Sequence, residues 1–214
     1  MYEKEKQEII NTGIMLDRYG LIALSGGNVS MKIAEDRVLV TPSGMFYSTL
    51  EPADILLVDM NGNIKEGTRK ASVDTEALLY IYNHIPKVNA IIHTHQPYAT
   101  ALGLVMNRIP CQLTTLANAT RGAVAVAPYT SAASVDMGKA AVEYLEDKLA
   151  VILKNHGVIA VGNSLRQALY SCVYLEEAAK TQAVASCIDK NVQEMTQEQV
   201  ARAVEVFDMY GQGK

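Results

Sequence analysis

Apolar positions recur along the chain with two periods, one typical of helices and the other of strands. Over residues 3–19 they fall at nearly helical spacing, at Ile9, Ile10 and Ile14, and the pattern ends at Gly20. Further helices are expected at 75–84, 99–105, 134–149, 164–186 and 197–209. Short apolar runs bounded by Asp, Pro or Gly favour strands at 38–40, 55–58, 90–95, 124–127, 151–153 and 158–161.

The order of these elements predicts one α/β domain that spans residues 1–214. The run Asn61-Gly62-Asn63 is typical of a tight turn that closes a hairpin. The chain has no linker rich in Pro, Gly or Ser, and no internal repeat. We therefore expect a largely antiparallel central sheet covered by helices on both faces.

Composition excludes several classes of function. The chain has 214 residues, 49% of them hydrophobic and 20% charged, with a net charge of −4 and no basic block, so a nucleic-acid partner is not expected. No run approaches the roughly 18 apolar residues of a membrane span. The charged N-terminus lacks the apolar segment of a signal peptide. The three cysteines share no close motif, which suits reduced thiols in a cytoplasmic protein.

Three of the four histidines lie in two short motifs that indicate a metal site. His93 and His95 are two positions apart on an expected strand, so their side chains point to the same side. His156 lies between two expected strands, at or beside a hairpin bend. Three imidazoles with an open fourth position form a common catalytic zinc set. The pattern therefore points to a metalloenzyme.

Three loops are rich in hydroxyl side chains, at residues 25–30, 41–44 and 72–76, and the first two also contain glycine. Each alone is typical of ordinary turns, and Ser72 or Asp74 could simply cap the helix that follows. Together with the histidines, they suggest a phosphate pocket that adjoins a metal. Asp74 could then be a fourth ligand, a general base, or each in turn, and Glu76 is the alternative base.

Five short motifs follow one another along the chain: Gly-Asn-Val-Ser, Thr-Pro-Ser-Gly, Ser-x-Asp-Thr, His-Thr-His and Asn-His-Gly. In these motifs and their order, the chain resembles the class II aldolase/adducin family. The resemblance covers almost the whole chain, as far as the tail Met209-Tyr210-Gly211. It implies a three-layer α/β/α fold, a Zn²⁺ site, a small sugar phosphate as substrate, and a homotetramer with active sites between neighbouring subunits.

The resemblance also implies a role for each matching residue. His93, His95 and His156 become the zinc ligands, and Asp74 falls at the family's metal-binding carboxylate and base. Tyr210 matches a tail tyrosine that donates a proton in the neighbouring subunit's site. The phosphate-binding positions fall on Gly27, Asn28, Ser43, Gly44, Ser72 and Val73. Val73 replaces the second serine of the family's pair, so its backbone N–H can still donate but one hydroxyl contact is lost.

Two reactions remain open within the family, aldol cleavage of an L-fuculose-1-phosphate-like ketose and 4-epimerisation of L-ribulose 5-phosphate. Asp74 is typical of the epimerases, whereas Thr41 is typical of the aldolases. The epimerase motif Thr-Thr-His-Ala-Asp occurs here as Thr114–Asn118, and an asparagine cannot act as a base. The balance favours a zinc-dependent aldolase that forms dihydroxyacetone phosphate and an aldehyde through an enediolate. A sugar-acid phosphate decarboxylase and a non-catalytic adducin-like interaction module are the alternatives, although the latter should lack the histidines.

Overall fold

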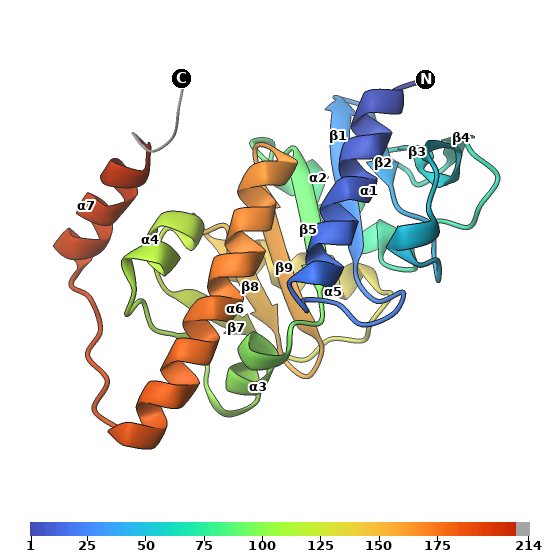
Figure 1. The fold of residues 1–214 in the computed structure, drawn as a ribbon. Helices are drawn as coiled ribbons and strands as arrows, with labels where there is room; N and C mark the ends of the chain where they lie inside the picture. Colours follow the sequence, from blue (N-terminus) through green and yellow to red (C-terminus); the bar gives the residue numbers. More distant parts are fainter. Residues whose placement is uncertain (209–214) are drawn as a thin grey trace.

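A mixed sheet of nine strands forms the centre of the computed structural model, which describes residues 1–208 (Figure 1). Its strand order is β4-β3-β2-β1-β5-β9-β8-β7-β6. All neighbours pair antiparallel except β7 and β8, which are parallel, so the expected largely antiparallel sheet is confirmed. The strands are β1 (Asn28–Ala34), β2 (Arg37–Val40), β3 (Leu56–Asp59), β4 (Ile64–Glu66), β5 (Ala90–Thr94), β6 (Arg108–Ile109), β7 (Val124–Ala127), β8 (Ala150–Leu153) and β9 (Gly157–Gly162).

Helices cover both faces of this sheet. They are α1 (Glu3–Arg18), α2 (Thr75–His84), α3 (Pro97–Val105), α4 (Thr114–Thr120), α5 (Val135–Leu145), α6 (Leu165–Ile188) and α7 (Gln197–Asp208), with short 3₁₀ turns at Tyr47–Thr49 and Pro52–Asp54. Helices α1, α3, α4 and α6 share one hydrophobic core with the sheet, whereas α2 and α5 share a second core. The fold is therefore a three-layer α/β/α arrangement.

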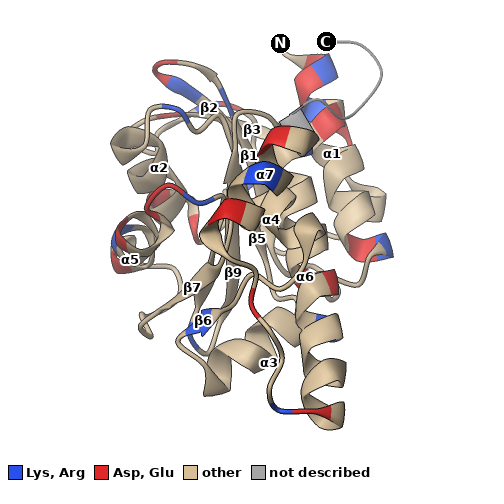
Figure 2. Cartoon of the chain, turned by 90° about the vertical axis from the view of Figure 1, so that its left-hand side faces the viewer, with Lys and Arg blue, Asp and Glu red and all other residues tan. Residues whose placement is uncertain are grey.

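The two cores follow from the alternation of side chains along the strands. In β5, Ile92 belongs to the core under α6 and Ile91 belongs to the core under α2. Strands β5, β7, β8 and β9 contain no Lys, Arg, Asp or Glu, and the charged residues gather on helices, turns and outer strands (Figure 2). Both faces of the central strands are buried, which explains their nearly continuous apolar sequences.

Three local details differ from the sequence expectations. The helix expected at 134–149 ends at Leu145, because Glu146 has a positive φ of 50° and Lys148 N–H closes a turn on the Leu145 carbonyl. Strand β1 was not expected, since buried polar residues such as Ser30 interrupt its apolar pattern. Helix α4 was not expected either, because its Thr and Asn residues have low helix propensity. Helix α4 is stabilised instead by its packing against α6 and against α7.

The hairpin expected at residues 61–63 joins β3 to β4, and Gly62 there has a φ of +83°. Among residues 1–208, no helix combines the length and the apolar character that crossing a bilayer requires.

Candidate metal and anion site

The three motif histidines meet at one end of the central strands. His93 lies near the end of β5, His95 follows that strand directly, and His156 lies in the turn between β8 and β9. Because β5 and β9 pair antiparallel, the last residues of β5 lie beside the first residues of β9. His93 Nε2 is 3.1 Å from His95 Nε2 and 3.3 Å from His156 Nε2.

This geometry fits a divalent metal held by three imidazoles. The ligand atoms of His93, His95 and His156 all lie within 4.8 Å of one another. Metal–nitrogen bonds of about 2.0–2.1 Å at tetrahedral angles separate the nitrogens by about 3.3 Å. Bare imidazole lone pairs at this separation repel each other, so a cation between them would stabilise the arrangement. The donor set is therefore chemically suited to Zn²⁺ or a similar ion.

The protonation state of the histidines also suits metal binding. The ring of His93 is 1% exposed, and burial, with a smaller contribution from His156 and His95, lowers its pKa to about 3. Its Nδ1 lies 2.9 Å from the Val158 carbonyl, so Nδ1 carries the proton and leaves Nε2 free for a metal. Desolvation also lowers the pKa of His95 and of His156, against the opposing charge of Asp74. All three rings are thus neutral at pH 7, as metal ligands must be.

Asp74 lies near the histidines without belonging to the group of three possible ligands. It occupies the N-cap position of α2, yet its side chain makes no capping hydrogen bond. Instead its Oδ2 accepts a bond of 2.8 Å from Asn28 Nδ2, and its Oδ1 accepts one of 3.3 Å from the Ala133 N–H. The carboxylate, only 7% exposed, is therefore held by β1 and by the loop before α5. Glu76 lies exposed in the first turn of α2.

The three hydroxyl-rich loops, 25–30, 41–44 and 72–76, lie close together. An isolated bridge pairs Pro42 with Ala71, and the Ser72 N–H donates to the Thr41 carbonyl at 3.1 Å. The Asn28–Asp74 bond ties the first loop to the third. The structure therefore brings together the loops that contain all six expected phosphate-binding residues, Gly27, Asn28, Ser43, Gly44, Ser72 and Val73.

Gly27 is required for this close packing. Its φ is +73°, and an added Cβ would lie 2.6 Å from the carbonyl oxygen of His93. Ser43 and Gly44 are exposed and Val73 is 63% exposed, so these three residues lie at the surface of the three-loop cluster. The Ser43 N–H donates to the Lys70 carbonyl at 2.9 Å, which leaves the Ser43 hydroxyl as its free donor in the described part of the chain. The Oδ1 atom of Asn28 is buried and has no hydrogen-bond partner within residues 1–208.

Sequence reasoning missed the loop before α5. Ala133, with a φ of 56°, donates its N–H to Asp74 across 59 positions of sequence. Ser134, a residue type that suits the N-cap of the helix expected from residue 134, makes no capping bond and donates its hydroxyl to the Ser131 carbonyl instead. Backbone donors leave no signature in a sequence, so no motif could have found Ala133. Tyr210, the expected proton donor, lies outside the described residues.

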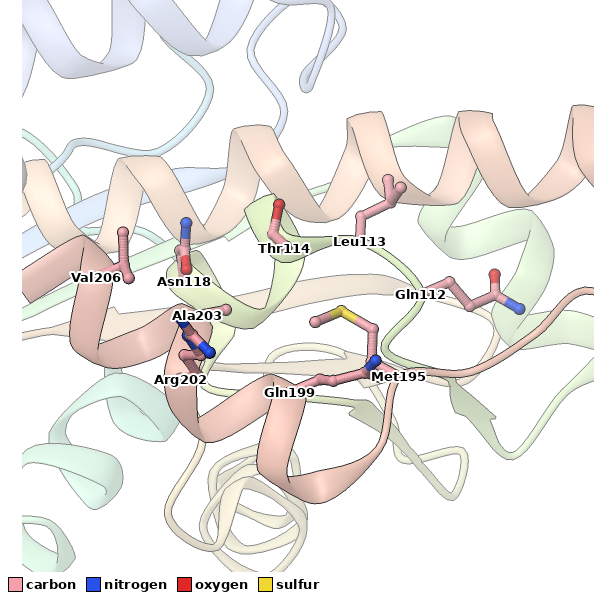
Figure 3. A pocket seen from close by; sticks show the side chains of 9 residues that line it. All are labelled: Gln112, Leu113, Thr114, Asn118, Met195, Gln199, Arg202, Ala203 and Val206. Atoms are coloured by element: carbon pink, nitrogen blue, oxygen red, sulfur yellow. The ribbon is translucent and has the colours of Figure 1, made fainter.

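The motif Thr114–Asn118 belongs to another part of the molecule. With α7 it borders a cavity of about 670 Å³, whose lining contains none of the histidines (Figure 3). Thr114 and Asn118 of α4 and Arg202 of α7 are among the residues that line this cavity (Figure 3). The lining residues are Gln112, Leu113, Thr114, Asn118, Met195, Gln199, Arg202, Ala203 and Val206.

Comparisons with known proteins agree with this architecture. Residues 7–183 match the family described as the Class II Aldolase and Adducin N-terminal domain. The chain is 30% identical over 213 residues to a 5-deoxy-D-ribulose 1-phosphate aldolase of Bacillus thuringiensis serovar kurstaki, and the match covers 99% of each protein.

Solved structures of L-fuculose 1-phosphate aldolases share the fold. One has a TM-score of 0.91 and 29% identity, over 97% of this chain and 98% of that chain. Another, from Thermus thermophilus, has a TM-score of 0.76 and 27% identity, over 87% and 96% of the two chains.

Proposed function

Because the chain belongs to the class II aldolase and adducin family, we propose that it is a zinc-dependent aldolase acting on a ketose 1-phosphate. The reaction cleaves the ketose reversibly into dihydroxyacetone phosphate and an aldehyde. The observation that carries the proposal is the convergence of three histidine Nε2 atoms beside a buried carboxylate. The similar proteins named above support this substrate class, because their names describe aldolases of ketose 1-phosphates.

In this proposal the three histidines bind the metal, and the three loops bind the substrate phosphate. His93, His95 and His156 would hold Zn²⁺, which supplies a positive charge that polarises a ketone oxygen. The backbone N–H groups and hydroxyls of the three-loop cluster bind the substrate phosphate. Two members of that cluster, Ser43 and Ser72, each offer a hydroxyl. The exposed Val73 contributes its N–H alone, so this pocket has one hydroxyl fewer than the usual family pattern.

Asp74 is the proposed general base. Its carboxylate is fixed from both sides by Asn28 and Ala133, so little reorientation is needed before it accepts a proton. The negative charge of Asp74 raises the pKa of both His95 and His156 against the effect of desolvation, which supports a role for Asp74 beside the metal. A base held in one geometry contributes more than a mobile one, since its orientation is fixed before the reaction.

The last proposed role belongs to Tyr210 and depends on the assembly of several subunits. We propose that Tyr210 of a neighbouring subunit exchanges a proton with the aldehyde-side oxygen, in a homotetramer with active sites between subunits. Deleting the tail should then slow bond cleavage more than proton exchange at the carbon of dihydroxyacetone phosphate. If the deletion slowed bond cleavage and proton exchange equally, Tyr210 would not have this role. A single domain over residues 1–214 and a cytoplasmic location complete the proposal.

A panel of ketose phosphates tests the activity directly. Purified protein with its bound metal is mixed with each ketose 1-phosphate, and release of dihydroxyacetone phosphate is followed by coupled NADH oxidation. Conversion of L-ribulose 5-phosphate without release of a fragment would identify an epimerase instead. Release of carbon dioxide from a sugar-acid phosphate would identify a decarboxylase. Absence of bound metal together with absence of turnover would favour an interaction module.

A further inference from the structure

Three buried polar side chains connect the histidine strand to helix α6 and face away from any expected substrate contact. They are Thr94, Gln96 and Glu176, which are 0%, 0% and 1% exposed. Glu176 lies in the middle of α6, whereas Thr94 and Gln96 flank His95. Burying polar atoms in an apolar core costs folding free energy unless each atom forms a hydrogen bond. The partners of these three side chains therefore indicate what the side chains hold in place.

The first connection runs through two side chains. The Thr94 hydroxyl donates to Gln96 Oε1 at 2.7 Å, and Gln96 Nε2 donates to the Cys172 carbonyl of α6 at 3.2 Å. Because side chains alternate along a strand, Thr94 points to the face opposite its two histidine neighbours. Its bond therefore fixes the backbone that supports both His93 and His95.

The second connection holds the start of helix α3. Pro97 is the first residue of this helix and has no N–H, and its ring restricts φ. The next two N–H groups, of Tyr98 and Ala99, donate to Glu176 Oε1 and Oε2 at 2.9 and 3.0 Å. A carboxylate at this point also interacts favourably with the helix dipole. The segment from His95 to α3 is thus held to α6 at both of its ends.

His95 depends on this backbone support more than His93 does. The ring of His93 is oriented by its own bond to the Val158 carbonyl. Among residues 1–208, the ring of His95 has no such bond to a backbone carbonyl, its Nε2 lies 3.1 Å from His93 Nε2, and His95 is exposed. Its backbone N–H donates to the Leu21 carbonyl at 3.2 Å. The direction of the ring is therefore set by the position of the main chain around residue 95.

We propose that Thr94, Gln96 and Glu176 are positioning residues, which align His95 for metal binding by holding the segment 94–99 to α6. The inference rests on the proposed metal site, but it concerns residues that touch neither metal nor substrate. Removing a group that is hydrogen-bonded to a metal ligand typically weakens metal binding by about 10- to 100-fold, and these residues act one step further out, through the main chain, so the lower end of that range is expected. Their loss should therefore weaken metal binding beyond any effect on folding.

Zinc affinity is measured by chelator competition on the full chain, for the wild type, Glu176→Gln, Thr94→Val and Ser171→Ala. Ser171 is the matched control, because it is also buried on α6 and its hydroxyl donates to the Ala119 carbonyl, away from the 94–99 segment. Glu176→Gln places an amide N–H₂ against a backbone N–H, and Thr94→Val removes one hydroxyl without changing the side chain's shape. Each should raise the zinc Kd about tenfold, whereas Ser171→Ala leaves it unchanged. The visible spectrum of the Co²⁺-loaded protein should shift only in the first two variants.

The outcomes separate the two proposals. If the wild type binds no zinc, the proposed metal site fails. If the wild type binds zinc and all three variants bind it equally well, with unchanged Co²⁺ spectra, the positioning role is overturned. The free energy of unfolding of each metal-free variant is measured alongside, so that a loss of affinity that merely follows lost stability counts against the role. Should Glu176→Gln not fold, Thr94→Val gives the same decision.

Discussion

Replacing Asp74 by asparagine separates a general base from a metal ligand. The amide oxygen of the new side chain can still accept the 2.8 Å bond from Asn28 Nδ2. Its N–H₂ group then faces the Ala133 N–H, which forms the longer 3.3 Å bond in the wild type. Losing that bond costs about 1–3 kcal/mol of folding free energy, so the protein should remain folded.

The expected loss of activity is much larger than the structural cost. A positioned acid or base contributes about 10²–10⁴-fold in rate, equivalent to about 2.7–5.4 kcal/mol of activation free energy. Asp74→Asn should therefore lower kcat by about a hundredfold or more. Metal content should stay unchanged, because Asp74 lies outside the group of three histidine ligands.

The assay follows dihydroxyacetone phosphate release together with deuterium exchange into that product, and the metal is quantified on the same samples. Glu76→Gln is the matched control, since Glu76 is an exposed carboxylate two residues away on α2. Its activity should remain that of the wild type. Retention of more than about a tenth of kcat in Asp74→Asn would assign the base elsewhere, since even a weak base contributes about 10²-fold. Loss of the metal from the Asp74→Asn variant would instead identify Asp74 as a metal ligand.

The remaining predictions concern the metal, one glycine and one ion pair. His95→Ala should weaken zinc binding more than about a hundredfold, beyond the usual effect of an outer partner, and unaltered zinc content after dialysis would contradict this. Gly27→Ala should destabilise the fold by about 2–4 kcal/mol in denaturant unfolding, because a left-handed φ and a Cβ only 2.6 Å from a strand β5 carbonyl oxygen act together. Gly20→Ala, at φ +68° with open space around it, should cost only the backbone part, and equal losses would refute the clash. The Lys6 ammonium, 2% exposed, lowers the pKa of Glu66 across a 2.7 Å bridge, so this carboxylate stabilises the fold above its unfolded pKa of about 4.3 and loses that contribution as the pH falls. Glu66→Gln should therefore flatten the acid limb of stability against pH, and an identical limb in both proteins would contradict the assignment.

The sequence by itself determined the elements whose hydrophobic period was clear. Residues 90–95 and 158–161 were expected as strands, and the structure pairs them as β5 and β9. The spacing of His93 and His95 placed both rings on one side, because the period of a strand is two. The motif order was sufficient to identify the family, which residues 7–183 match.

The sequence could not place elements that depend on distant partners. In β1, Asn28 and Ser30 interrupt the apolar pattern, yet both are buried, because the Asn28 amide donates to Asp74 and the Ser30 hydroxyl bonds to the Tyr82 hydroxyl. Ser72 and Asp74 could be interpreted as an ordinary helix cap, and only the tertiary structure turns the Asp74 carboxylate toward Asn28.

Tertiary structure also decided which motif belongs to which site. The motif Thr114–Asn118 falls where the epimerases have a catalytic segment, but here it lies on α4 and borders the cavity between α4 and α7. The N–H of Ala133 and the buried carboxylate of Glu176 have no signature in sequence, since their roles depend on partners 59 and 77–78 positions away. Local periodicity is a property of neighbouring residues and can be read from the chain. A hydrogen bond to a distant backbone group exists only once the sheet and its helices have packed, because that packing sets the distance between the two atoms.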